Sequence, residues 1–190
     1  MPGKIPTQLA ILAAGAFLVA TQVFAQSQTR TDPGIRTPAA EQVLNAAFET
    51  ARAEQKVVLT HFGASWCTWC LHLDAMLTSD EVGSLFQDNY VITHLTVQES
   101  DDKVALENPG AQEILDAAGA GDSGLPAYII FDSDGKQLAT SLVMPGGGNI
   151  GHPVTPDEIV AFLVLLDQTA PRMTAADRDR VSAYLTNQNL

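Results

Sequence analysis

The sequence predicts a small α/β domain in which helices cover both faces of a mixed β-sheet. Apolar runs of strand length alternate with segments of helical periodicity, and the last two strand-like runs are separated only by the turn Asp132 to Gly135. Strands joined through a helix pair in parallel, whereas a tight turn gives an antiparallel hairpin. The sheet should therefore contain parallel strands plus an antiparallel C-terminal hairpin.

The elements are expected in the order helix, strand, helix, strand, helix, hairpin, helix. Apolar residues at i, i+3, i+4 and i+7 between residues 44 and 51 predict the first helix. Thr155 and Glu158 have the spacing of a capping box, which opens the helix after the hairpin. A weakly apolar helix over 174–185 is expected to pack at the periphery. The predicted strands are 57–62, 91–97, 127–131 and 136–143.

Composition limits the classes of partner. The chain has 190 residues and 46% hydrophobic residues, enough for one domain with a real core. Its formal net charge of -12 repels phosphate backbones, so nucleic acid is excluded as an expected partner. The acidic residues are scattered, which is typical of a solubilising surface.

Residues 1–25 have the pattern of a secretory signal peptide. Lys4 precedes an apolar run over 9–20, and small residues at 23 and 25 suit cleavage before Gln26. The run is short for a bilayer span, so the membrane is a partner only if the segment stays uncleaved. We expect a periplasmic or secreted protein. Its remaining parts are a flexible lead-in at 26–38, a domain at 39–170 and a C-terminal helix within 171–190.

The only two cysteines, Cys67 and Cys70, are three positions apart. A link this short removes little chain entropy, so its purpose is more chemical than structural. The strand over 57–62 leads through a short turn into a helix that begins at Cys67, where unpaired N–H groups and the helix dipole favour a thiolate. Cys67 is the expected nucleophile, and Cys70, one turn later, is the expected resolving thiol.

Two motifs resemble the thioredoxin family, and most closely its exported bacterial members. They are the Trp66-Cys67-Thr68-Trp69-Cys70 passage after a hydrophobic strand, and Gly124-Leu125-Pro126-Ala127 before the strand at 127–131. The resemblance implies a thioredoxin fold and a thiol:disulfide oxidoreductase that needs no cofactor. Its partners would be protein thiols and disulfides and a redox-recycling protein. It also implies a cis Pro126 facing the cysteines, with the backbone of Leu125 free to pair with an extended substrate.

The chain departs from the family pattern at several places. His61 stands six residues before Cys67, where the family commonly has a buried carboxylate, and Thr68-Trp69 replaces Gly-Pro. An imidazole at position 61 suits proton relay between Cys70 and solvent, because histidine titrates near neutrality. The alternative is an ordinary core histidine. No role follows from the resemblance for the insert at 98–108 or for the tail after Pro171.

The two tryptophans are candidate substrate-binding residues. Trp66 is expected to form a surface platform beside the reactive sulfur, the alternative being packing against the hairpin. Trp69 lies between the cysteines and is either exposed for recognition or fills a crevice.

Other functions remain as alternatives. A haem site is excluded because Leu71, and not histidine, follows Cys70. A metal site could recruit His72 with the two cysteines, but no fourth ligand is indicated, so no metal is predicted. The main rival to an enzyme is a thioredoxin-fold binding module for an extended peptide, a partner subunit or a metal, with incidental redox activity.

Overall fold

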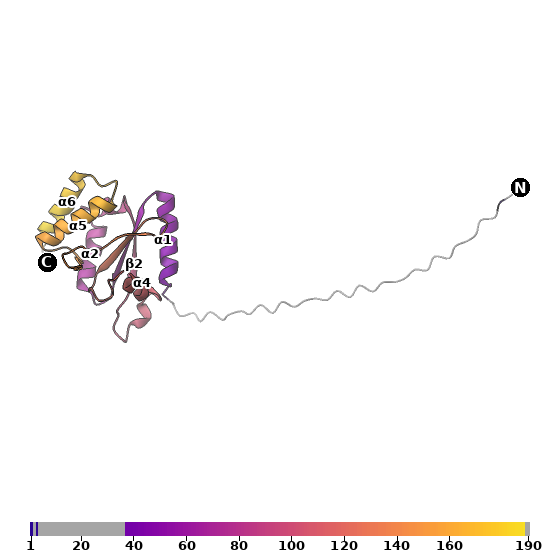
Figure 1. Ribbon diagram of the computed structural model, residues 1–190, viewed down its shortest axis with the longest axis horizontal. Helices are drawn as coiled ribbons and strands as arrows, with labels where there is room; N and C mark the ends of the chain where they lie inside the picture. Colours follow the sequence, from indigo (N-terminus) through magenta and orange to yellow (C-terminus); the bar gives the residue numbers. More distant parts are fainter. Residues whose placement is uncertain (2, 4–36, 189–190) are drawn as a thin grey trace. The chain divides into compact units, whose positions relative to one another are not determined.

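The computed structural model describes residues 1, 3 and 37–188 (Figure 1). The expected signal peptide, apart from residues 1 and 3, and almost all of the lead-in lie outside these residues. The predicted elements are present in the predicted order, and the structure also contains one short 3-10 helix, η1, that was not expected. In chain order they are α1 (Ala40–Glu54), β1 (Val57–Gly63), α2 (Thr68–Thr78), α3 (Gly83–Gln87), β2 (Tyr90–Thr96), η1 (Val104–Leu106), α4 (Ala111–Ala117), β3 (Ala127–Phe131), β4 (Gln137–Thr140), α5 (Pro156–Thr169) and α6 (Ala175–Asn187).

The four strands form one mixed sheet, as predicted, and their order in the sheet is β2-β1-β3-β4. β1 is parallel to the edge strand β2, while β3 runs antiparallel to both β1 and β4. The last strand is shorter than the predicted 136–143 and ends at Thr140. The N–H of the next residue, Ser141, still donates to the Tyr128 carbonyl of β3, and the Ser141 carbonyl accepts the N–H of Ile150 from the far end of a glycine-rich loop.

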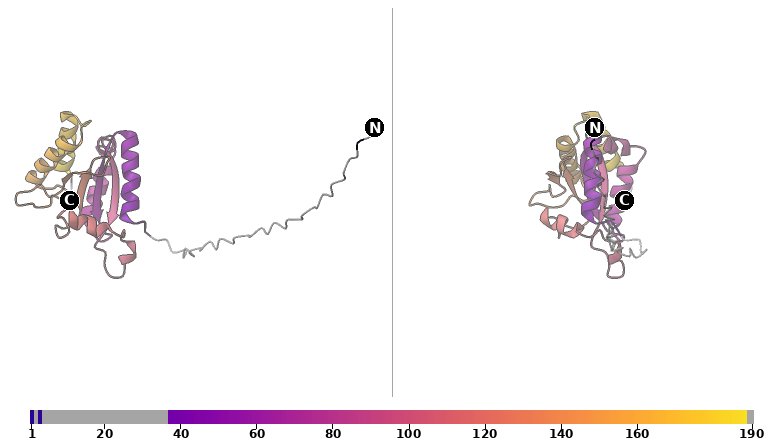
Figure 2. Two further views of the ribbon diagram at one scale, coloured as in Figure 1. Left: turned by 45° about the vertical axis from the view of Figure 1, so that its right-hand side comes forward. Right: turned by 90° about the vertical axis from the view of Figure 1, so that its right-hand side faces the viewer.

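Two apolar cores fill the space between the sheet and the helices on its two faces. One face is covered by α1 and α4, and the other by α2, α3, α5 and α6 (Figures 1 and 2). β1 supplies both cores, since successive side chains of a strand point to opposite faces: Val58 and Phe62 face α1, and Leu59 faces the α5 side. This central position fixes the end of β1, from which the cysteine segment departs.

The C-terminal helix α6 lies against α5 (Figure 1). Thr174 and Asp177 form its capping box, and Val181 and Leu185 are fully buried in the core beside α5. The side chain of Gln188 then bonds to His152 and to the carbonyl of Pro153. The helix therefore braces the loop that precedes α5.

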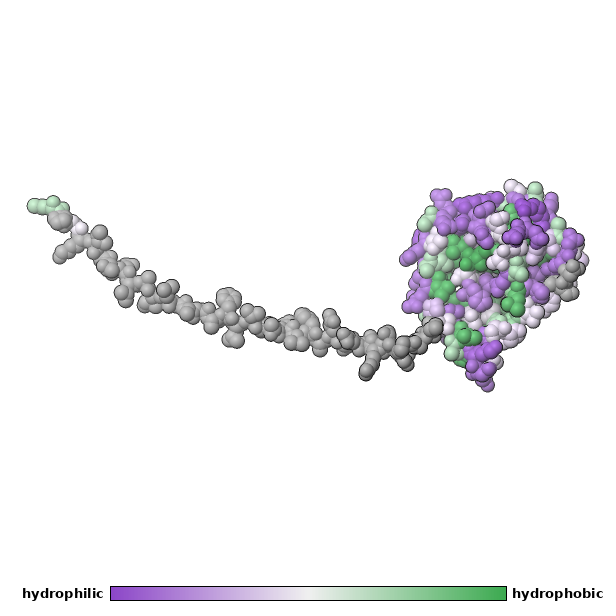
Figure 3. Space-filling model, turned by 180° about the vertical axis from the view of Figure 1, so that it is seen from behind, coloured by the Kyte–Doolittle hydropathy of each residue, from purple (hydrophilic) through white to green (hydrophobic). Residues whose placement is uncertain are grey.

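The face seen in Figure 3 is largely hydrophilic, with apolar residues in separate patches. Two exposed apolar pairs belong to the segments near the cysteines: Trp66 and Trp69, and Val104 and Leu106 in η1. Within the described part of the chain, no helix is both long enough and apolar enough to cross a bilayer.

Candidate active site

Cys67 is the N-cap residue of α2, as predicted, and forms a disulfide with Cys70. The backbone N–H of Cys70 donates to the Cys67 sulfur at 3.1 Å. The sulfur therefore lies at the point toward which the unpaired N–H groups of the first helical turn are directed. The turn into the helix is closed by the N–H of Cys67, which donates to the Ala64 carbonyl. A negative charge on this sulfur is favoured by the same amides and by the helix dipole.

The disulfide is covered in this oxidised form. Cys67 and Cys70 are each only 3% exposed, and they pack in a small apolar group with Ala64 and the partly buried Leu125. Leu125 is thus next to the cysteines, where the resemblance implied a substrate-facing residue.

The peptide bond between Leu125 and Pro126 is cis, as the resemblance implied. The side-chain amide of Asn149 donates to the carbonyls of Gly124 and Pro126 at 2.9 and 3.0 Å. Sequence analysis missed Asn149, which lies in a glycine-rich stretch with no residue pattern that indicates a role. Its amide holds the loop in front of β3 in place.

Both tryptophans are exposed, Trp66 by 56% and Trp69 by 46%. The indole N–H of Trp66 donates to the carbonyl of Gln98 at 2.8 Å, which ties this side chain to the 98–108 insert. The Trp69 ring stacks on His152 with centroids 6.4 Å apart and lies 5.5 Å from His72. His72 therefore belongs with Trp69 and His152 and does not join the cysteines in a ligand cluster.

An open groove of about 390 Å³ runs beside the cysteine segment. Three predicted site residues meet on its wall: Trp69, Leu125 and Pro126. Asn149 and His152 line the other parts of the wall, with Glu158 at the start of α5. Trp66 does not line this groove.

The insert at 98–108 has a structural role that the sequence did not indicate. The buried Glu99 carboxylate accepts the N–H of Ser65 at 2.6 Å and its hydroxyl at 2.8 Å. Lys103 reaches the same hydroxyl at 3.2 Å. The insert thus fixes the turn two residues before Cys67.

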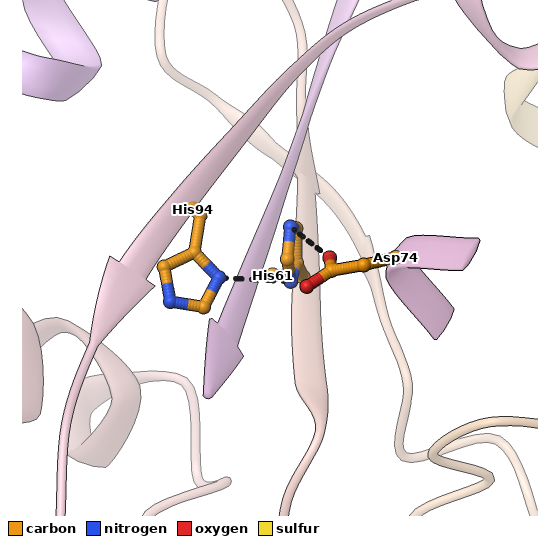
Figure 4. Close-up of side chains that lie close together, drawn as sticks. All are labelled: His61, Asp74 and His94. Atoms are coloured by element: carbon orange, nitrogen blue, oxygen red, sulfur yellow. Dashed lines mark hydrogen bonds and ion pairs between the residues drawn. The ribbon is translucent and has the colours of Figure 1, made fainter. Parts of the chain in front are cut away.

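His61 is buried and lies between two polar partners (Figure 4). Its Nε2 is 3.2 Å from a carboxylate oxygen of Asp74 on α2, and its Nδ1 is 3.2 Å from Nδ1 of His94 on β2. The parallel register places His61 directly beside His94. Burial, helped by the neighbouring His94, lowers the pKa of His61 to about 3. Burial also lowers the pKa of His94 and raises that of Asp74.

These three residues are the one group of potential metal ligands found within the described chain, with ligand atoms inside 4.8 Å of one another. However, His61 directs its two ring nitrogens at different partners, and a metal needs one lone pair from each ligand directed at a common point. The arrangement is a hydrogen-bonded chain of a carboxylate and two imidazoles.

Sequence analysis missed His94 and Asp74 as companions of His61. Two signals were present: each histidine is the fifth residue of its strand, and Asp74 follows Cys70 by one helical turn. Neither signal is informative until the pairing register is known, because one residue of slip moves a side chain to the opposite face.

Comparisons with known proteins agree with this geometry. A family described as thioredoxin-like matches residues 39–133, half of the chain. The curated "Disulfide bond reductase DsbH" of Chlamydia pneumoniae is 30% identical over 107 residues, which are 54% of this chain and 61% of that protein. The chain therefore spans about three-fifths of the length of this relative.

Two solved structures are similar to this chain over about three quarters of its length. A disulphide isomerase from Xylella fastidiosa Temecula1 covers 78% of this chain and 92% of its own at 22% identity, with a TM-score of 0.46. A structure titled "DsbH Oxidoreductase" covers 77% of this chain and 94% of its own at 20% identity, with a TM-score of 0.44. On the family match and the observed fold, this chain belongs to the thioredoxin-like family.

Proposed function

We propose that this protein is an exported thiol:disulfide oxidoreductase that exchanges disulfides with protein substrates. One observation carries the proposal: the two cysteines form a disulfide at the start of α2, with the first sulfur at the N-cap. The pKa of the Cys67 thiol is expected to lie below that of a free cysteine, because helix-start amides stabilise its thiolate.

In the reducing direction, the Cys67 thiolate attacks one sulfur of a substrate disulfide. A mixed disulfide forms, and the other substrate sulfur leaves as a thiolate that takes up a proton. Cys70 then loses its proton and attacks the Cys67 sulfur, which releases the second substrate thiol and regenerates the Cys67–Cys70 disulfide. An acid–base group near Cys70 assists this second step, and the candidate at the family position is His61.

The reducing direction is supported by the name of the Chlamydia pneumoniae relative, a disulfide bond reductase. The cycle then needs a second protein that returns two electrons to the Cys67–Cys70 disulfide. We propose that this recycling partner docks on the same side of the molecule, since it attacks the same pair of sulfur atoms.

The groove beside Leu125 suits an extended substrate segment. Among the hydrogen bonds of the described residues outside helices and strands, none uses the N–H or C=O of Leu125, so this backbone is free to pair with a substrate strand. Trp69 lines the groove and Trp66 is exposed nearby in sequence, and both offer aromatic area to an unfolded or extended chain.

Export is proposed from residues 1–25 alone, which carry the charged, apolar and small-residue pattern of a signal peptide. Expression of the full chain in a bacterium with a periplasm tests it. Release by osmotic shock of a protein that begins at Gln26 is the expected result. A full-length protein that stays in the cytoplasm would contradict it.

Reduction of insulin disulfides by thiol-regenerated protein tests the catalytic proposal. The wild type should accelerate insulin precipitation, and Cys67→Ser should abolish this activity. Cys70→Ser should accumulate a mixed disulfide with insulin, because the resolving thiol is missing. Equal activity of wild type and Cys67→Ser would refute the enzyme and leave the binding module as the better account.

A further inference from the structure

We propose that His94 is the acid–base residue that takes the proton of Cys70, and that His61 and Asp74 are positioning residues that orient it. The inference rests on the proposed disulfide exchange and assigns its second step to specific atoms. It moves the base from the family position, His61, to its neighbour on β2. Nothing in the sequence distinguished His94.

Gly63 brings the imidazole and the sulfur together. A side-chain carbon at this position would lie 2.9 Å from Cε1 of His94 and 3.1 Å from Sγ of Cys70. Both atoms therefore border the same space above the Gly63 backbone, and no side chain at position 63 separates them. Gly63 is the last residue of β1, which places this contact at the strand end where the cysteine segment begins.

The chain of hydrogen bonds determines which nitrogen of His94 is the base. Asp74 carries no proton as a carboxylate, so Nε2 of His61 must donate to it. Nδ1 of a neutral His61 is then an acceptor, and Nδ1 of His94 must donate to it. This leaves the lone pair of His94 on Nε2, on the far side of Cε1 from His61.

Figure 4 shows how the His94 ring is oriented. Nδ1 of His94 faces His61, while the edge formed by Nε2 and Cε1 lies toward the carboxyl ends of β1 and β2. That is the end of the sheet at which Gly63 and the disulfide lie. The same logic operates wherever a carboxylate selects the tautomer of a catalytic histidine.

The surrounding ionisable groups support neutral imidazoles at neutral pH. Desolvation lowers the pKa of His61 and of His94, so both are unprotonated there. Tyr90 on β2 and Tyr128 on β3 face the same side of the sheet, and burial raises the pKa of each, which keeps them uncharged. Within the part of the chain that the structure describes, Asp74 on α2 is the one carboxylate grouped with His61 and His94.

Every proton and bond is accounted for in the proposed step. Nε2 of His94 accepts the proton of the Cys70 thiol, and the new thiolate forms a bond to the Cys67 sulfur. The bond between Cys67 and the substrate sulfur breaks, and the substrate leaves as a thiolate that gains a proton. His94 is exposed, so its added proton passes to solvent. Reduction of the Cys67–Cys70 disulfide reverses the path, with His94 as the acid.

The test follows one equivalent of Ellman's reagent reacting with the reduced full chain at several pH values. Each half of the reagent leaves as a coloured thiolate. The first release reports attack by Cys67 on the reagent, and the second release reports attack by Cys70 on the resulting mixed disulfide. In the wild type, the second rate should be nearly constant between pH 7 and pH 8, where a histidine with a lowered pKa is neutral. In His94→Ala it should be at least about tenfold slower at pH 7 and rise with pH, since only the spontaneously ionised thiol then reacts. Added imidazole should partly restore it.

The rate of the second thiolate release also tests the positioning role of Asp74. Asp74→Ala should slow the second release several-fold in the wild type but have no further effect in His94→Ala, because the carboxylate acts through His94. Thr93→Ala, on the opposite face of β2, is the matched control and should match the wild type. A wild-type rate and pH profile in His94→Ala would overturn the inference. A wild type that releases no first thiolate would instead refute the proposed disulfide exchange.

Discussion

The side-chain amide of Asn149 donates a hydrogen bond to the carbonyl oxygen of Pro126 at 3.0 Å. The same amide bonds to the Gly124 carbonyl at 2.9 Å, and Oδ1 of Asn149 accepts the N–H of Gly151 at 3.1 Å. One side chain therefore joins the loop that contains the cis proline to the loop that leads to α5. Both loops line the proposed substrate groove.

Asn149→Ala should loosen that groove. We expect insulin reduction to fall several-fold and the free energy of unfolding to fall by about 1–2 kcal/mol, since two carbonyls lose a donor. The first thiolate release with Ellman's reagent should be unchanged, because the small reagent does not need the groove. Asn45→Ala, an exposed asparagine on α1, is the control. Equal insulin reduction by both variants would remove Asn149 from the substrate site.

The Glu99 carboxylate is expected to stabilise the turn before the cysteines. Glu99→Ala leaves the N–H and hydroxyl of Ser65 without their buried acceptor, which should cost about 1–3 kcal/mol in the free energy of unfolding. Urea unfolding measures the change, with Glu49→Ala, an exposed glutamate on α1, as the control. A loss no greater than that of Glu49→Ala would show that the insert does not brace this turn.

Leu125 is expected to shield the disulfide from small thiols. It packs against both cysteines, which are each 3% exposed, so Leu125→Ala should open a path to the sulfur atoms. The rate of reduction by glutathione should rise several-fold, as followed by thiol titration. Leu138→Ala on β4 removes an exposed leucine of the same size and should leave the rate unchanged. An unaltered rate in Leu125→Ala would mean that access is limited elsewhere.

Burial of His61 makes the stability of the fold depend on pH. Its pKa is lowered to about 3, whereas the unfolded chain titrates normally, so on acidification the unfolded state takes up a proton that the folded state does not. The full contribution is present above neutral pH and is lost as the pH falls. Between pH 7 and pH 5 this one group should reduce the free energy of unfolding by about 2 kcal/mol.

His61→Asn should remove most of that dependence, which urea unfolding at the two pH values measures. The lowered pKa of His94 acts in the same direction as His61, and the raised pKa of Asp74 acts in the opposite one. The comparison between wild type and variant therefore isolates the contribution of His61 to the pH dependence of the free energy of unfolding. A variant that loses as much stability as the wild type between pH 7 and pH 5 would contradict the burial of a neutral imidazole.

The sequence by itself determined the features that depend on neighbours along the chain. The strand before Cys67, the helix that begins there and the capping box of Thr155 and Glu158 were all predicted and are all present. Each follows from local backbone preference, from apolar periodicity or from capping over three residues. The cis Pro126 was also correct, but on the family resemblance, because isomer preference is not visible in composition or spacing.

Only the tertiary structure decided which distant side chains meet around the cysteines. His94 reaches His61 across 33 residues, Glu99 reaches Ser65 across 34, and Asn149 reaches Pro126 across 23. These contacts depend on strand register and on the paths of two loops, and a shift of one residue in register would turn His94 to the other face of the sheet. Local sequence does not encode that register, because it is set by the packing of the whole sheet between its two layers of helices.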